Sequence, residues 1–70
     1  MQRERYESLL RMPEVVRRIG LQPAHVYALE ARGDFPRRVK LGPRASAWVE
    51  SEVSAWIESR IAARDARRAA

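Results

Sequence analysis

The sequence predicts one mainly α-helical domain that carries a small β-hairpin. Two short stretches with apolar residues at helical spacing are separated by Gly20-Leu21-Gln22. A stretch of alternating apolar and charged residues follows, and the last third of the chain returns to helical spacing. The length of 70 residues leaves room for a single domain. This order is typical of a winged helix-turn-helix, in which a hairpin, the wing, follows a helix pair.

The charge of the whole chain is its most informative bulk property. Fourteen Lys+Arg face nine Asp+Glu, which gives a net charge of +5 and a pI near 11.0. This balance is typical of nucleic-acid-binding domains, although proteins that bind membrane surfaces or acidic partners share it. There is no cysteine and one histidine, so we expect no metal and no cofactor. Because no apolar run is long enough to span a membrane and no signal-peptide pattern is present, we expect a cytoplasmic protein without membrane contact.

The first helix is predicted to begin at Pro13, which Met12 precedes. Pro13 suits the first helical position, because its missing N–H would be unpaired there. Gly20 is expected to end the helix as a left-handed cap. Four residues form its apolar face: Met12, Val15, Val16 and Ile19. Since so short a helix is not stable alone, this face must pack on the rest of the domain.

The second helix is predicted to start at Pro23 for the same reason, with Gln22 as a weak N-cap. Val26 and Leu29 form its inward pair, and Gly33 ends it. Steps of about 100° per residue then place the remaining side chains. Ala24, Tyr27, Ala28 and Ala31 face outward, His25 and Arg32 lie on one flank, and Pro23 and Glu30 lie on the other.

An outward face of small side chains can enter the major groove of DNA deeply. There, alanine methyl groups can meet thymine methyl groups, and Tyr27 can contact a phosphate or a sugar. His25 is in the first turn, where the helix dipole favours anions. The alternative is a solvated helix with an inert surface histidine, since this face carries no long hydrogen-bond donor. No neighbouring group has a spacing that would make His25 catalytic, and no enzyme motif is present.

The hairpin is predicted around Gly42-Pro43-Arg44. Val39 and Leu41 alternate with Arg38 and Lys40 on the first arm, and the second arm runs through Ala45, Ala47 and Val49. Four cations fall within eight residues without an acid among them: Arg37, Arg38, Lys40 and Arg44. Cations on a hairpin can neutralise phosphates and release counterions, which supplies much of the affinity for nucleic acid. The alternative is a solvated charged face.

The last helix is predicted to begin at Ser51 as N-cap. Its buried stripe is expected to contain Val53, Trp56, Ile57 and Ile61. Trp48 and Trp56 are expected in the core, because a small domain needs its largest side chains inside; stacking on single-stranded bases is the alternative.

The order of these residues resembles the AlpA family of small regulators associated with phages and mobile elements. The resemblance covers roughly residues 9–64. It rests on these segments: Leu10-Arg11-Met12-Pro13-Glu14-Val15-Val16, Gly20-Leu21, Val26-Tyr27, Gly33-Asp34-Phe35-Pro36-Arg37, Val39-Lys40-Leu41-Gly42-Pro43-Arg44, Trp48 and Glu52-Val53-Ser54-Ala55-Trp56-Ile57. The block from Gly33 to Trp48 is the most specific part.

The resemblance implies a MerR-like winged helix-turn-helix fold, related to excisionases, with the helix 23–32 in the major groove and the hairpin 37–48 as wing. Relatives commonly have Leu-Ser-Arg-Ser-Thr-Ile-Tyr-Arg where this chain has residues 21–28. The capping serine is Gln22 here, and two arginines are Pro23 and Ala28. Arg38 stands where proline is usual, and it would partly replace the lost charge.

From these features we expect a sequence-specific regulator of phage or mobile-element transcription that binds double-stranded DNA at the nucleoid. Residues 1–8 would be a flexible segment, residues 9–66 the DNA-binding domain, and residues 67–70 a basic tail. The expected DNA-binding residues are Gln22, Pro23, Ala24, His25, Tyr27, Ala28, Arg32, Arg37, Arg38, Lys40 and Arg44. A homodimer and a contact with a recombinase, integrase or RNA polymerase are further candidate partners. The alternatives are an excisionase-like factor that bends DNA and a module that binds an acidic protein.

Overall fold

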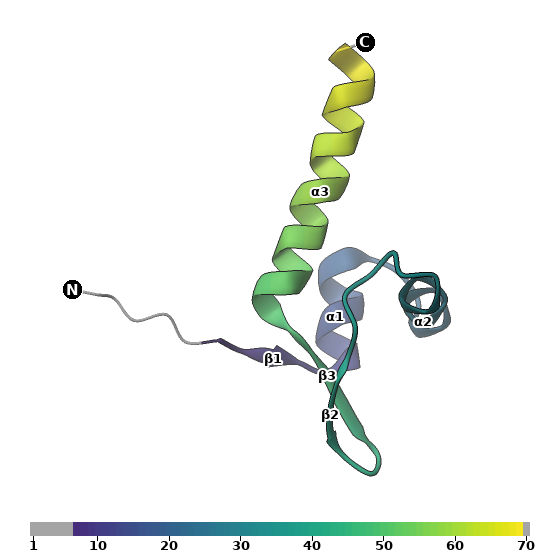
Figure 1. Cartoon of the computed structure of the whole chain (residues 1–70), viewed down its shortest axis with the longest axis vertical. Coiled ribbons are helices and arrows are strands. Elements are labelled where there is room, and N and C mark those ends of the chain that lie inside the picture. The colour runs from purple at the N-terminus through teal and green to yellow at the C-terminus, as the bar shows by residue number, and fades with distance from the viewer. Residues whose placement is uncertain (1–6, 70) are drawn as a thin grey trace, which may run out of the picture.

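Three helices and a small antiparallel sheet make up the computed structural model, which describes residues 7–69. In chain order the elements are β1 (Leu9–Leu10), α1 (Met12–Ile19), α2 (Pro23–Ala31), β2 (Val39–Gly42), β3 (Ala45–Val49) and α3 (Glu50–Ala69) (Figure 1). The predicted fold class, mainly α-helical with a small β-hairpin and compatible with a winged helix-turn-helix, is confirmed. Of the N-terminal segment predicted to be flexible, residues 1–6 lie outside the described residues.

The bounds of α1 and α2 follow from proline and glycine as predicted. Each helix has a proline in its first turn. Gly20 ends α1 in the left-handed region at a φ of 76° and donates its N–H to the carbonyl of Val16. Gly33 follows α2 at a φ of 81°, a conformation that costs other residues energy. Gln22 makes no side-chain cap bond to α2, in line with its weak capping ability.

The sheet contains one more strand than the predicted hairpin. β3 is central, pairing with β2 on one side and with β1 on the other. The hairpin register pairs Val39 with Ala47, and a bulge lies between Lys40 and Gly42. On the other edge, Leu10 pairs with Trp48. β3 also contacts α1 and α3 and contributes two residues to the core, Ala47 and Trp48.

The core lies where α1, α2 and α3 meet the sheet. Six buried side chains form its main cluster: Leu10, Val15, Val26, Phe35, Trp48 and Val53. Trp48 is fully buried and donates its indole N–H to the carbonyl of Pro36 at 3.1 Å. Trp56 is half-buried; it packs against the cluster and donates to the carbonyl of Asp34 at 2.7 Å. Both tryptophans therefore serve packing, as expected, with their polar N–H groups satisfied.

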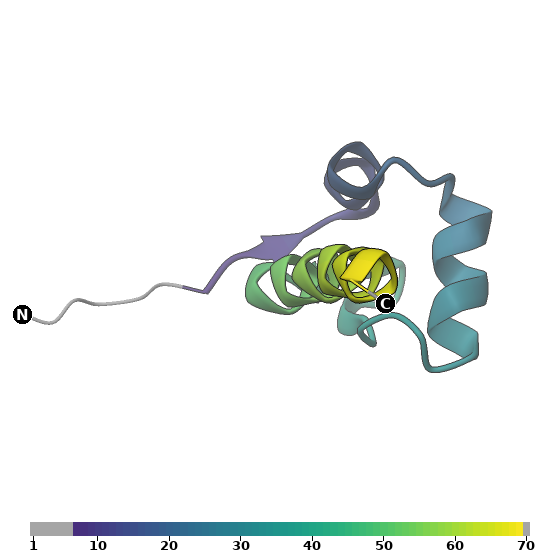
Figure 2. The same cartoon turned by 90° about the horizontal axis from the view of Figure 1, so that it is seen from above.

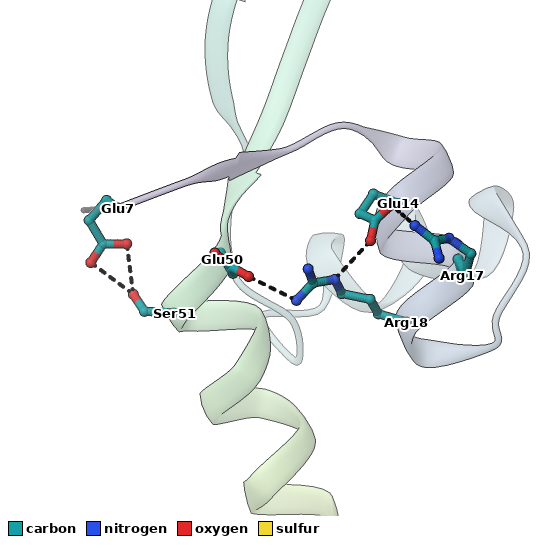
Figure 3. Close-up of polar contacts among 6 residues, drawn as sticks. All are labelled: Glu7, Glu14, Arg17, Arg18, Glu50 and Ser51. Carbon is teal, nitrogen blue, oxygen red and sulfur yellow. Dashed lines mark hydrogen bonds and ion pairs between the residues drawn. The ribbon is translucent and has the colours of Figure 1, made fainter. Parts of the chain in front are cut away.

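The last helix differs from its prediction at its start and in one residue of its buried stripe. α3 begins at Glu50, so Ser51 lies inside the helix and is not its N-cap. The Ser51 hydroxyl instead donates to the carboxylate of Glu7 (Figure 3). The N–H of Glu50 donates to the carbonyl of Ser8 at 2.8 Å. Ile61 is 41% exposed, which corrects its assignment to the buried stripe. It is exposed because the C-terminal half of α3 projects beyond the other elements (Figure 1).

An ion-pair network links α1 to the start of α3. Glu14 accepts hydrogen bonds from Arg17 and Arg18, and Arg18 also reaches the carboxylate of Glu50 at 3.1 Å (Figure 3). The hydrogen bonds from Arg17 and Arg18 hold the pKa of Glu14 below its ordinary value of 4.5. Hydrogen bonds to Glu14 and Glu50 raise the pKa of Arg18. Since these groups are solvated, the network orients two helices more than it stabilises the fold.

Replacing Glu14 with glutamine is expected to lower the melting temperature slightly at neutral pH, and the difference from wild type should disappear in acid. The folded-state pKa of Glu14 lies below the unfolded value, so the stability from its charge is present above pH 4.5 and is lost as pH falls through the folded value. Circular dichroism melts between about pH 7 and pH 3 test this. Glu58→Gln, at an exposed position without a salt bridge among the described residues, is the matched control. A Glu14→Gln deficit that persists unchanged in acid would contradict the assignment.

Candidate nucleic-acid interface

The outward face of α2 is open and built of small side chains. Ala24, Tyr27, Ala28 and Ala31 are exposed, whereas Val26 is buried and Leu29 is half-buried. This is the arrangement predicted from helical spacing. Figure 2 shows α2 at the outer edge of the molecule, with the other elements on one side of it. The face is therefore accessible along the length of the helix.

The start and one flank of this face carry polar groups that can donate hydrogen bonds. Gln22, His25 and Arg32 are exposed and can donate; Pro23 is exposed as well but has no N–H to donate. Arg32 pairs with Asp34 at 3.2 Å, but the side chains are 65% and 58% exposed. A pair this solvated is weak and can be exchanged for another partner. The Arg32 guanidinium is thus still available to an anion beside α2.

Three wing cations reach solvent without an acidic partner. Arg37, Lys40 and Arg44 are exposed and form no salt bridge within the described part of the chain. The wing also exposes two apolar side chains, Val39 at 38% and Leu41 at 48%. The alternating pattern predicted the strand, but it did not show that these residues would face solvent.

Arg38 differs from the other wing cations, because it bonds to α2. The side chain of Glu30 is only 8% exposed and its Oε1 lies 2.8 Å from the Arg38 guanidinium. Its Oε2 accepts the backbone N–H of Arg38 at 2.7 Å and the Nε–H at 3.2 Å. The Arg38 guanidinium also lies over the Tyr27 ring, 4.8 Å from the centroid. Arg38 therefore joins the wing to α2, and its charge is largely matched by Glu30.

This placement changes the interpretation of Arg38. Sequence reasoning grouped it with Arg37, Lys40 and Arg44, because the stretch itself contains no acid. The acid comes from Glu30, eight residues earlier in another element. Helical spacing placed Glu30 on a flank of α2, and no local signal connects it to the wing.

Replacing Arg38 with alanine is expected to destabilise the domain by about 1–3 kcal/mol, because a nearly buried carboxylate loses its guanidinium partner. Combining Arg38→Ala with Glu30→Gln should cost less than the sum of the single changes, with a coupling of about 0.5–3 kcal/mol. Urea unfolding of the four proteins measures this. Arg37→Ala is the matched control, expected within about 0.5 kcal/mol of wild type. Additive single effects would show that the pair does not couple wing and helix.

Two contacts join α2 to the hairpin. Tyr27 on α2 lies 6.2 Å, ring to ring, from Trp48 on β3, and the Glu30–Arg38 pair ties α2 to the start of β2. These contacts hold the helix face and the wing cations in a fixed relation. Among residues 7–69 no group of three His, Cys, Asp or Glu side chains could hold a metal ion. In the same range, no helix is long and apolar enough to cross a membrane.

Comparison with known proteins adds a family match. The family described as Prophage CP4-57 regulatory protein (AlpA) matches residues 8–61, from β1 into the middle of α3. A protein of Enterobacteria phage P4, described as Uncharacterized protein ORF88, is 47% identical over 47 residues, which are 67% of this chain and 53% of that protein. The chain thus spans about half the length of this curated relative. The family match contains both helices of the helix-turn-helix and the whole wing.

Proposed function

The chain belongs to the AlpA family of prophage regulatory proteins, and we propose that it binds double-stranded DNA and regulates transcription of phage or mobile-element genes. One observation carries this proposal: an exposed helix face of small side chains stands beside a wing with three exposed, unpaired cations. Those cations are Arg37, Lys40 and Arg44 among the described residues. Unpaired cations beside an accessible helix favour an anionic partner such as the DNA backbone.

In this proposal α2 lies in the major groove. Its small side chains let the helix backbone approach the base edges closely, and the methyl groups of Ala24 and Ala28 can contact thymine methyl groups. Hydrogen-bond donors come from the start and flank of the helix, at Gln22, His25 and Arg32. The N-terminal residues of a recognition helix are the usual base contacts, which is where two of these donors stand.

The wing supplies affinity in the same proposal. Arg37, Lys40 and Arg44 neutralise phosphates beside the groove and release counterions. Arg38 acts differently, because its contacts with Glu30 and Tyr27 fix the angle between wing and helix. DNA affinity therefore depends directly on Arg37, Lys40 and Arg44. It depends on Arg38 indirectly, because Arg38 positions the wing against α2.

Titration of a random-sequence DNA duplex over a series of salt concentrations tests the proposal. DNA binding predicts a negative slope of log affinity against log salt, and Arg44→Ala should reduce that slope by about one unit, because one phosphate contact is lost. Fluorescence anisotropy measures both. Arg67→Ala, at the far end of α3, removes the same charge away from the wing and should leave the slope close to wild type. Absent or salt-independent binding would reject DNA and favour a protein partner.

The second candidate function is that of an excisionase-like factor that bends DNA with the same surface. The exposed Leu41 and Val39 favour it, since apolar side chains on DNA-binding elements can wedge between base steps and bend the duplex. Energy transfer between dyes at the two ends of a bound duplex separates the roles. A shortened end-to-end distance indicates an excisionase-like factor, and an unchanged distance indicates a regulator that binds straight DNA. A homodimer and a recombinase, integrase or RNA polymerase contact stay predictions.

A further inference from the structure

A groove lies between the α1–α2 turn, α2 and α3, on the side of α2 that faces the projecting helix. Its volume is about 540 Å³, which is within the range of ligand pockets. In the view of Figure 2, α3 points toward the viewer and α2 lies to its right. Its floor is apolar and consists of Ile19, Leu21, Leu29, Trp56, Ile57 and Ile61.

The apolar floor is only partly covered by the fold. Five of its residues are half-buried, and Ile61 is 41% exposed. They extend the core cluster outward, from Leu29 on α2 to Ile61 on the free half of α3. Side chains of residues 58–68 are all exposed, so nothing in the described chain covers this half of the helix. These apolar side chains are therefore open to contact with a partner.

The polar lining of the groove, here called its margin, contains Arg18, Arg32 and Arg60 and one acid, Asp34. Arg18 pairs with Glu14 and Glu50, and Arg32 pairs with Asp34. The Arg60 guanidinium lies over the Trp56 ring at 5.7 Å and forms no salt bridge among the described residues. Further along α3, Arg64, Arg67 and Arg68 outnumber Asp65. A partner in the groove therefore meets apolar side chains beside the guanidinium of Arg60 and the basic C-terminal half of α3.

Charge and polarity decide between three kinds of occupant. A DNA backbone would match the margin but not the apolar floor. A second copy of this chain would bring its own basic α3 against the same cations, since residues 60–69 contain four Arg and one Asp. An acidic amphipathic helix matches both features, with apolar residues on the floor and carboxylates toward Arg60 and Arg32.

We propose that this groove docks an acidic amphipathic helix of a partner protein. The groove shares His25 and Arg32 with the proposed DNA surface, while its apolar floor and Arg60 lie outside it. The docking site therefore overlaps the proposed DNA surface at these two residues, whereas its apolar lining and Arg60 do not depend on whether α2 binds DNA.

Selection from a displayed library of random peptides of about 15 residues, four helical turns, tests the proposal with the full chain. The expected peptides are net negative, with apolar residues at i, i+3 or i+4, and i+7. Enriched peptides are then synthesised and titrated by fluorescence anisotropy. Ile61→Glu should weaken their binding at least about tenfold, since it places a carboxylate where apolar and acidic groups dock. Arg60→Glu should weaken it similarly by charge reversal.

Ala62→Glu is the matched control, because it adds the same charge at the next residue, about 100° further around α3, which does not line the groove. Its affinity for the selected peptides should stay within about twofold of wild type. Both Ile61 and Ala62 are exposed, so the variants should fold, which circular dichroism checks. Enrichment of neutral or basic peptides, or equal losses in Ile61→Glu and Ala62→Glu, would overturn the proposal. Sedimentation showing a dimer that Ile61→Glu dissociates would also overturn it, by placing a second copy in the groove.

Discussion

Replacing Trp48 with alanine is expected to unfold the domain. Trp48 is fully buried on the central strand β3, and removing a core aromatic side chain typically costs about 3–5 kcal/mol. A 70-residue domain has a total stability of only a few kcal/mol, so the loss is comparable to all of it. The variant also leaves the carbonyl of Pro36 without its indole donor. Far-UV circular dichroism should show loss of helix at about 25 °C, and urea titration should show no cooperative transition.

Trp56→Ala is the matched control for this result. Trp56 packs edge-to-face on Phe35, with ring centroids 5.0 Å apart, but it is half-buried at the edge of the core. Water already reaches part of its ring, so less apolar surface is lost on truncation. We expect Trp56→Ala to remain folded with a lowered urea midpoint. If Trp48→Ala unfolds at the same midpoint as wild type, the core does not centre on β3.

The bounds of α1 and α2 were predictable because they depend on local backbone chemistry. Pro13 and Pro23 lack the N–H that would be unpaired in a first turn, and Gly20 and Gly33 adopt the positive φ that ends a helix. The inward position of Val26 follows from helical geometry, as does the outward position of the alanines on α2. The helix face proposed for DNA is therefore a consequence of residue spacing alone.

Features that depend on distant neighbours were not predictable in the same way. Helical spacing assigned Ile61 to the buried stripe, but a side chain is buried only where another element packs on it. The C-terminal half of α3 extends beyond the other elements, so Ile61 is exposed. Serine is a favourable N-cap residue, but α3 begins directly after β3, at Glu50, so Ser51 lies inside the helix. The Glu30–Arg38 pair joins two elements across eight residues. In each case the outcome depends on how separate elements are placed relative to one another, and the neighbouring residues in the sequence do not indicate that placement.

Replacing Ala24 with glutamate is expected to weaken DNA binding by about a hundredfold while leaving the fold intact or slightly more stable. Ala24 is exposed in the first turn of α2, where a carboxylate interacts favourably with the helix dipole. The same carboxylate would stand at the proposed groove contact, where it meets phosphates and base acceptors of like charge. Such juxtaposition costs several kcal/mol, and about 2.7 kcal/mol corresponds to a hundredfold loss. Anisotropy titration and thermal melts of the same samples measure the two effects.

Ala62→Glu separates this local effect from the general change in charge. It lowers the net charge by the same amount at an exposed position of α3 that belongs to neither α2 nor the wing. A general electrostatic effect would weaken both variants equally, and it would fade for both as salt rises. A contact through α2 predicts a large loss in Ala24→Glu alone, which persists at high salt because the glutamate also blocks close approach of the helix. Equal affinities for the two variants would remove α2 from the interface and leave the wing as the DNA-binding element.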